Sequence, residues 1–268
     1  MTSRLLVVAA AAVGLIWLTE RRNRDYRSAL TLWEDTLAER PQNAIAHANL
    51  ADSLIEAGRI GDGIAEYEAA LRLRPRYAEA HADLAAALDR MGRQAEAISH
   101  YQASLGINPR EPKVHNLLGI ALLHSGRPSE AIPYFEAALA LRPGYEAARY
   151  NLGLALARQD RLEEAISQYR EALRLEPADA DAANELGAAL ATTGRLSEAE
   201  DALKRALRIK PELADAENNL GIVLAEEGRA AEAVAHFERA VRLRPGFIEA
   251  KRNLEIARRG AVPGGQPP

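Results

Sequence analysis

Three histidines are the residues of this chain that most resemble metal ligands. His47, His81 and His115 recur at intervals of 34 residues. Metal ligands on one helix usually stand three or four residues apart, and no carboxylate–histidine cluster at that spacing accompanies these three. The interval instead places them at equivalent positions of separate structural units, so we expect no metal site.

Glutamates recur at the same interval as the histidines. They are Glu96, Glu130, Glu164, Glu198 and Glu232. Each opens a predicted helix, where the positive end of the helix dipole favours a carboxylate, and they do not form a catalytic pair. The sequence also has no phosphate-binding loop and no combination of nucleophile and base. We therefore expect no catalysis and no cofactor in this chain.

A 34-residue repeat, marked by seven prolines, sets the elements that carry these residues. The prolines are Pro41, Pro75, Pro109, Pro143, Pro177, Pro211 and Pro245. A period of this length is typical of stacked helical hairpins. We number the columns of each repeat from its starting residue, which is Ala44, Ala78, Pro112, Glu146, Ala180 or Ala214.

Each repeat predicts two helices. In the first, column seven is leucine, column eight is alanine or glycine and column eleven is leucine, so all three lie on one face. A glycine in five repeats, and Asp160 in the fourth, ends this helix. In the second helix, column 24 is large and columns 20 and 27 are small. The small residues let the two helices approach closely, and the proline ends the pair because it lacks an N–H.

These columns resemble the tetratricopeptide repeat over about residues 25–259. The resemblance implies an all-α fold, a right-handed superhelix (α-solenoid) that binds proteins or peptides. Its six hairpins would span residues 44–77, 78–111, 112–145, 146–179, 180–213 and 214–247. A half-repeat at 25–43 would precede them, and a capping helix at 248–259 with a polar outer face would follow. We expect the Pro/Gly tail at 260–268 to be disordered.

One column departs from the family pattern. Column four, where the family has a bulky aromatic residue, holds His47, His81, His115, Arg149, Ala183 and Glu217.

The N-terminal residues 1–24 contain a segment without charge, Leu5–Leu18. A helix of that length spans about 21 Å against roughly 30 Å of hydrocarbon, and including its neighbours with Arg4 snorkelling makes crossing possible. We predict a membrane helix. The alternatives are a cleaved signal peptide and the buried first helix of a degenerate repeat. The arginines that follow favour repeats on the cytoplasmic side.

The junction after this segment carries a second resemblance. It is similar to the start of the C-terminal repeat arm in polytopic bacterial membrane proteins related to the transmembrane and tetratricopeptide-repeat O-mannosyltransferases. The residues that carry it are Arg22, Asn23, Tyr26, Leu32, Trp33, Pro41, Asn43 and His47. It implies repeats on the non-cytoplasmic side and a catalytic part that is absent from this chain. We expect a single-pass protein of the bacterial inner membrane. The two indications of topology conflict, so the repeats are either cytoplasmic or periplasmic.

Composition excludes several other classes. The chain has 34 basic and 38 acidic residues, a formal net charge of −4, which argues against nucleic acid as a partner. It has no cysteine, which excludes disulfides, thiolate catalysis and cysteine-based zinc sites.

The resemblance implies that the first helices line a concave groove. In repeats three and four the inward columns form an apolar patch edged by amides, which is typical of a partner site. These residues are Asn116, Leu117, Ile120, Leu123, Tyr150, Asn151 and Leu154. The alternative is that adjacent hairpins bury most of them.

Column six adds a series of asparagines at Asn49, Asn151, Asn219 and Asn253. It resembles the asparagine ladder of the O-GlcNAc transferase superhelix, which implies binding of an extended backbone, but in this chain Asp83, Leu117 and Glu185 interrupt it. Local hydrogen bonding within each hairpin is the alternative. The function that we expect is a membrane-tethered scaffold that binds a protein or peptide in this groove. The alternative is the substrate- or partner-binding arm of a membrane glycosyltransferase-like protein.

Overall fold

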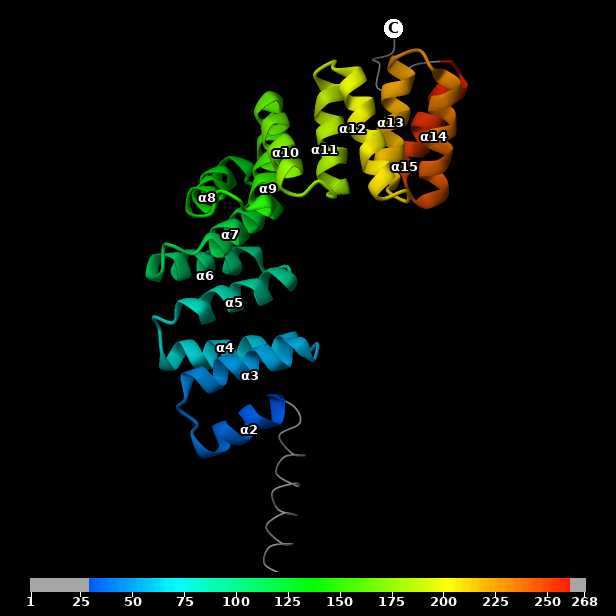
Figure 1. The fold of residues 1–268 in the computed structure, drawn as a ribbon. Helices are drawn as coiled ribbons and strands as arrows, with labels where there is room; N and C mark the ends of the chain where they lie inside the picture. The colour runs from blue at the N-terminus through cyan, green and yellow to red at the C-terminus, as the bar shows by residue number, and fades with distance from the viewer. Residues whose placement is uncertain (1–28, 261–268) are drawn as a thin grey trace, which may run out of the picture. The chain divides into compact units, whose positions relative to one another are not determined.

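The computed structural model describes residues 29–260, and these form fourteen α-helices with no strand among them (Figure 1). The first helices of the six repeats are α3 Ala44–Glu56, α5 Ala78–Arg90, α7 Pro112–His124, α9 Glu146–Ala157, α11 Ala180–Thr192 and α13 Ala214–Glu226. The second helices are α4 Ile60–Leu73, α6 Gln94–Ile107, α8 Pro128–Leu141, α10 Leu162–Leu175, α12 Leu196–Ile209 and α14 Ala230–Leu243. Helix α2 Ala29–Glu39 precedes them, and α15 Ile248–Arg258 follows. Every first helix begins at the residue from which the repeat was numbered.

Two predictions fall on other residues. The predicted membrane helix at residues 5–18 and the tail after residue 260 lie outside the described part of the chain and stay predictions. Among the helices described between residues 29 and 260, none is both long enough and apolar enough to cross a membrane.

The helices form two compact units, Met1–Arg110 with α2 to α6 and Glu111–Pro268 with α7 to α15. Within each unit, the two helices of a repeat pack on each other, and each second helix packs on the first helix of the next repeat. In the second unit, successive first helices also contact one another, from α7 through α15. Figure 1 shows α13, α14 and α15 packed side by side in this way.

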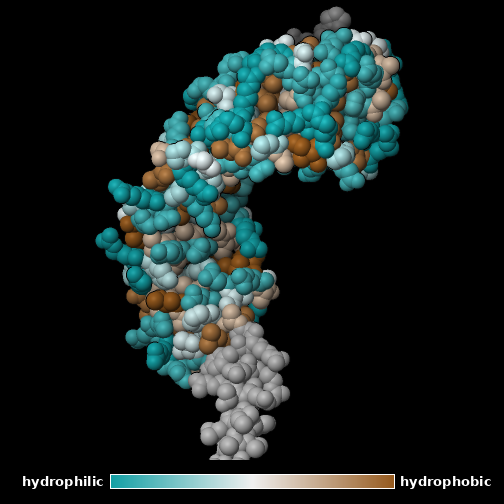
Figure 2. Space-filling view, in the orientation of Figure 1, coloured by the Kyte–Doolittle hydropathy of each residue, from teal (hydrophilic) through white to brown (hydrophobic). Residues whose placement is uncertain are grey.

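The core of each hairpin depends on a large side chain opposite a small one. Tyr169 of α10 is fully buried, and a Cβ added to Gly153 of α9 would lie 2.5 Å from its Cε1 atom. Gly119 has the same relation to Phe135 in the preceding repeat. Glycine in column eight therefore lets the first helix rest directly on an aromatic ring. Outside the core, apolar side chains appear as separate patches among hydrophilic ones (Figure 2).

The turn between the two helices requires a left-handed backbone. Gly194 has a φ of 76° there, and Asp160 of repeat four has a φ of 57°. Aspartate tolerates this region better than most residues because its short polar side chain can hydrogen-bond locally, which explains the one exception to the glycine column.

Substitution of Gly153 tests the aromatic–glycine contact. We expect Gly153→Ala to lower the free energy of unfolding by about 1–3 kcal/mol, and Gly153→Leu to lower it more, because Tyr169 has no space into which it can move. Urea denaturation followed by circular dichroism measures the change. Gly106→Ala is the matched control: its added Cβ would meet nothing within 4 Å, and alanine has the higher helix propensity. A similar loss in both variants would contradict the packing argument.

Candidate partner-binding surface

The predicted apolar patch lies on α7 and α9, two first helices that contact each other. Leu117, Ile120, Tyr150 and Leu154 are all half-buried, so part of each side chain is open to solvent. They lie on these two neighbouring first helices, in repeats three and four. The patch can therefore contact a partner while remaining supported by its neighbours.

Three of the predicted contact residues are buried. Asn116, Leu123 and Asn253 are only 4%, 5% and 6% exposed. Asn116 is covered because α9 packs against α7 and brings Asn151 over it. Asn116 and Leu123 of α7 support the patch and Asn253 belongs to α15; none of the three faces a partner directly, which corrects the expectation for them.

The asparagines form hydrogen bonds between repeats. The Nδ2 of Asn151 donates to the Oδ1 of Asn116 at 3.0 Å, across the step from α9 to α7. Asn219 donates in the same way to Asn184, and Asn253 to Asn218, each at 3.0 Å. The bonds run from one hairpin to the preceding one, and so differ from the alternative of local bonding within each hairpin.

These pairs orient the amides that remain accessible. An amide that donates one N–H keeps its second N–H and its carbonyl oxygen for another partner. Asn151 and Asn219 are half-buried and meet that condition. Asn49 is half-buried in α3 of the first unit, where its backbone carbonyl accepts the hydroxyl of Ser53 at 3.0 Å.

The series is interrupted between repeats four and five. Here Tyr150 occupies column five and Glu185 occupies column six. Burial raises the pKa of the Glu185 carboxyl, although a hydrogen bond from Asn184 partly opposes the change. Burial and then the charge of Glu185 raise the pKa of the Tyr150 hydroxyl. An apolar, amide-lined surface thus becomes acidic at this step.

Column four has a structural partner that the sequence reading missed. Its side chains face column 23, which lies 19 residues further on in the second helix. His47 Nδ1 contacts Glu66 at 2.6 Å, and His81 Nδ1 contacts His100 Nδ1 at 2.9 Å. In repeat six the buried Glu217 contacts His236 at 2.6 Å. The sequence contained a signal for this contact, because the residue in column 23 changes together with the residue in column four from one repeat to the next.

The same column also ties repeats one, two and four to the proline before each of them. His81 Nε2 lies 3.1 Å from the carbonyl oxygen of Pro75, and Arg149 Nη2 lies 3.0 Å from that of Pro143. Such carbonyls at a helix C-terminus have no partner within the helix. The polar residues that replace the family aromatic are therefore structural links. In the described residues, no group of three or more histidine or carboxylate side chains could hold a metal ion.

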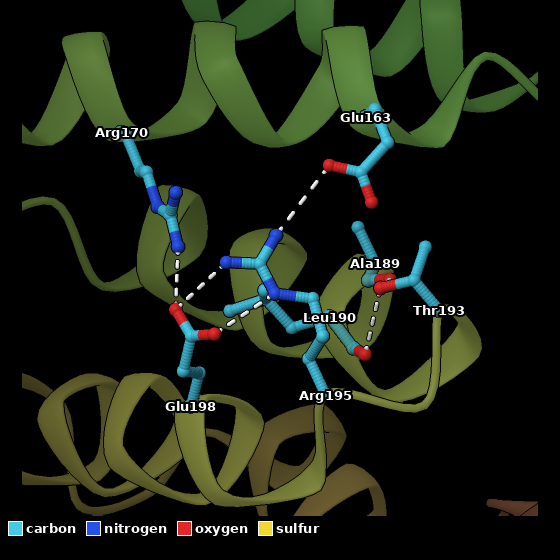
Figure 3. Close-up of polar contacts among 7 residues, drawn as sticks. All are labelled: Glu163, Arg170, Ala189, Leu190, Thr193, Arg195 and Glu198. Carbon is cyan, nitrogen blue, oxygen red and sulfur yellow. Dashed lines mark hydrogen bonds and ion pairs between the residues drawn. The ribbon is translucent and has the colours of Figure 1, made fainter.

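The repeated glutamates lie where they were predicted, in the first turn of second helices. Each pairs with the arginine three residues before it, and that hydrogen bond lowers the pKa of the carboxyl in Glu96, Glu130, Glu164, Glu198 and Glu232. Figure 3 shows one such pair extended between repeats: Arg195 lies between Glu198 and Glu163, and Arg170 contacts Glu198 at 2.6 Å. Exposed pairs of this kind contribute little individually.

Comparison with known proteins agrees with this architecture. The tetratricopeptide repeat pattern matches residues 18–60, 48–112, 116–175 and 161–214, and a second pattern of the same description matches residues 214–247. The chain therefore belongs to the tetratricopeptide repeat family. A search of curated proteins gives no significant match.

Solved structures of the same fold are numerous. One is described as YrrB, a TPR protein with an unusual peptide-binding site: it is 26% identical, has a TM-score of 0.62, and the match covers 69% of this chain and 95% of YrrB. MamA is 26% identical with a TM-score of 0.57, over 62% of this chain and 91% of its own. PilF of Pseudomonas aeruginosa is 23% identical with a TM-score of 0.67, over 78% and 95%, and shows the fold alone.

The histidine pair of repeat two predicts a loss of stability in acid. Burial, and then the charge of His81, lower the pKa of His100 below its ordinary value of 6.5. Below pH 6.5 the unfolded chain therefore binds more protons at this position than the folded chain, and the free energy of unfolding falls as the pH falls. We expect His100→Gln to lose less stability than the parent between pH 7.5 and pH 5.5, measured by urea denaturation.

The control for this experiment is Gln102→Ala, which changes an exposed, uncharged residue of α6. It should leave the pH dependence as it is in the parent. A His100→Gln variant with the full acid sensitivity of the parent would show that the pair is not its source.

Proposed function

We propose that this chain is an interaction scaffold that binds an extended segment of a protein or peptide along the first helices of its second unit. The observation that carries the proposal is the half-buried apolar patch of Leu117, Ile120, Tyr150 and Leu154. Apolar surface of this kind, bordered by polar groups, is typical of partner sites. The net charge of −4 favours a protein or peptide over nucleic acid.

The amides next to the patch suit a backbone. Asn151 and Asn219 are held by bonds to the preceding repeat, so their free amide atoms are already oriented. A preoriented donor and acceptor lose less conformational entropy when a partner binds. The patch would thus bind apolar side chains, while the amides would bind the backbone of the same segment. A peptide-binding site is also named for YrrB, which has the same fold.

The finer part of the proposal is a membrane tether through residues 5–18. It rests on the uncharged length of Leu5–Leu18 and on the arginines that follow it. The resemblance of the junction to glycosyltransferase-like membrane proteins rests on sequence as well. Alkaline extraction of membranes, followed by protease treatment of intact spheroplasts, separates an anchored chain from a released one and reports the side of the repeats.

Two charges placed in the patch should abolish binding. We expect Ile120→Glu with Leu154→Glu to remove capture of displayed peptides by the purified chain, because each glutamate would lose hydration against an apolar partner. Both side chains are half-buried, so the helix content should stay the same. The measurement is enrichment from a random peptide library, with circular dichroism for helix content.

A matched double variant controls for added charge. Met91→Glu with Ile248→Glu changes two exposed apolar residues, 52% and 81% exposed, that lie outside the patch. It should bind as the parent does. Unchanged capture by the Ile120 and Leu154 variant would refute the proposed site.

A further inference from the structure

Four carboxylates surround one end of the apolar patch. The patch ends at Tyr150, and its neighbours Glu146 of α9 and Asp179, Asp181 and Glu185 at or within α11 all act on the hydroxyl of Tyr150 through their charge. By contrast α7, at the other end, contains no aspartate or glutamate. We call these four carboxylates with Tyr150 the acidic rim. The surface is therefore polarised along the direction in which a peptide would lie.

The arginine that acts on Glu185 already has another partner. Arg158 is the basic residue that acts on Glu185, and its Nη1 donates to the carbonyl oxygen of Leu123 at 2.9 Å. Asp215 of the next first helix already pairs with Arg244. Burial and a hydrogen bond to Asp179 raise the pKa of the Glu146 carboxyl, as expected for two carboxylates held together. A positive charge bound at the rim would therefore reduce the repulsion between its carboxylates.

A buried hydroxyl at the same place lacks a partner. In repeat one, the hydroxyl of Tyr67 in column 24 donates to Asp52 in column nine. In repeat four column nine is Leu154, and the equivalent hydroxyl of Tyr169 is fully buried and has no hydrogen-bond partner. Its ring lies 6.1 Å from that of Tyr150, and its pKa is raised by burial and then by Glu185. An unsatisfied buried hydroxyl costs stability, so its presence beside the rim points to a ligand.

We propose that the acidic rim binds a lysine or arginine side chain of the peptide whose apolar residues occupy the neighbouring patch. The cation would contact the carboxylates and the face of Tyr150, an arrangement that combines charge–charge and cation–π attraction. The Tyr169 hydroxyl could then accept from it or donate to a carboxylate. This inference rests on the proposed function, because the patch must bind the same peptide.

The test is selection of displayed random peptides of about twelve residues, which reach roughly 40 Å when extended. The parent chain should enrich peptides in which a lysine or arginine lies on one side of the apolar residues along the peptide. Individual enriched peptides, measured by fluorescence anisotropy, should lose about tenfold or more in affinity when that cation is replaced by serine. Replacement by glutamate should weaken binding further.

The variant Asp181→Asn with Glu185→Gln tests the rim without touching the patch or the helix N-cap at Asp179. We expect it to bind the serine peptides as the parent does and to lose the preference for the cation. The control is Glu136→Gln with Asp201→Asn, which removes two exposed carboxylates from second helices and should keep the preference.

The outcomes separate the two proposals. Enrichment without a bias towards cations, or a bias that persists in the rim variant, would overturn the rim and leave the patch intact. Failure of the parent to enrich any peptide above the Ile120→Glu and Leu154→Glu variant would overturn the proposed function, and the rim with it.

Discussion

The contact between a large buried side chain, an aromatic ring in three repeats and Leu203 in repeat five, and a bare helix backbone sets the geometry of the hairpins in the second unit. Where Gly153 meets Tyr169, no Cβ separates the two helices, and the first helix rests on the ring. That distance fixes how the second helix reaches the next repeat, because each second helix packs on the following first helix. The surface formed by the first helices is a product of this repeated spacing.

Polar chemistry replaces apolar packing where the chain departs from its family. Column four carries histidine, arginine or glutamate in five repeats and Ala183 in the other, and in repeats one, two, four and six the polar side chain contacts column 23 of the same hairpin. His47 with Glu66 and His81 with His100 show how different pairs occupy the same place. The Nε2 of each histidine also contacts the carbonyl of the preceding proline, so that one ring joins three segments of chain. Residues that resembled metal ligands are thus part of the fold.

The fold was predictable from the sequence, because glycine, proline and small residues act locally and recur. Helix starts at Ala44 and Pro112 followed directly from the repeat. The surface was predictable in part: Ile120 and Leu154 are accessible, whereas Asn116 and Leu123 are covered by a neighbouring helix. Their burial depends on how successive hairpins stack, and no single repeat contains that information. The asparagine bonds are of the same kind, since each joins residues 35 positions apart.

Those bonds also give the array an order. Repeats of equal length look interchangeable, but at three steps of the second unit an amide in column six donates to an amide in column five of the preceding repeat. Excision of residues 180–213 would keep every helix boundary and yet bring Asn219 against Tyr150 in place of Asn184. The fold of the second unit should therefore tolerate loss or duplication of a repeat less well than the regular period suggests. The residues in columns five and six fit a repeat to its particular neighbour.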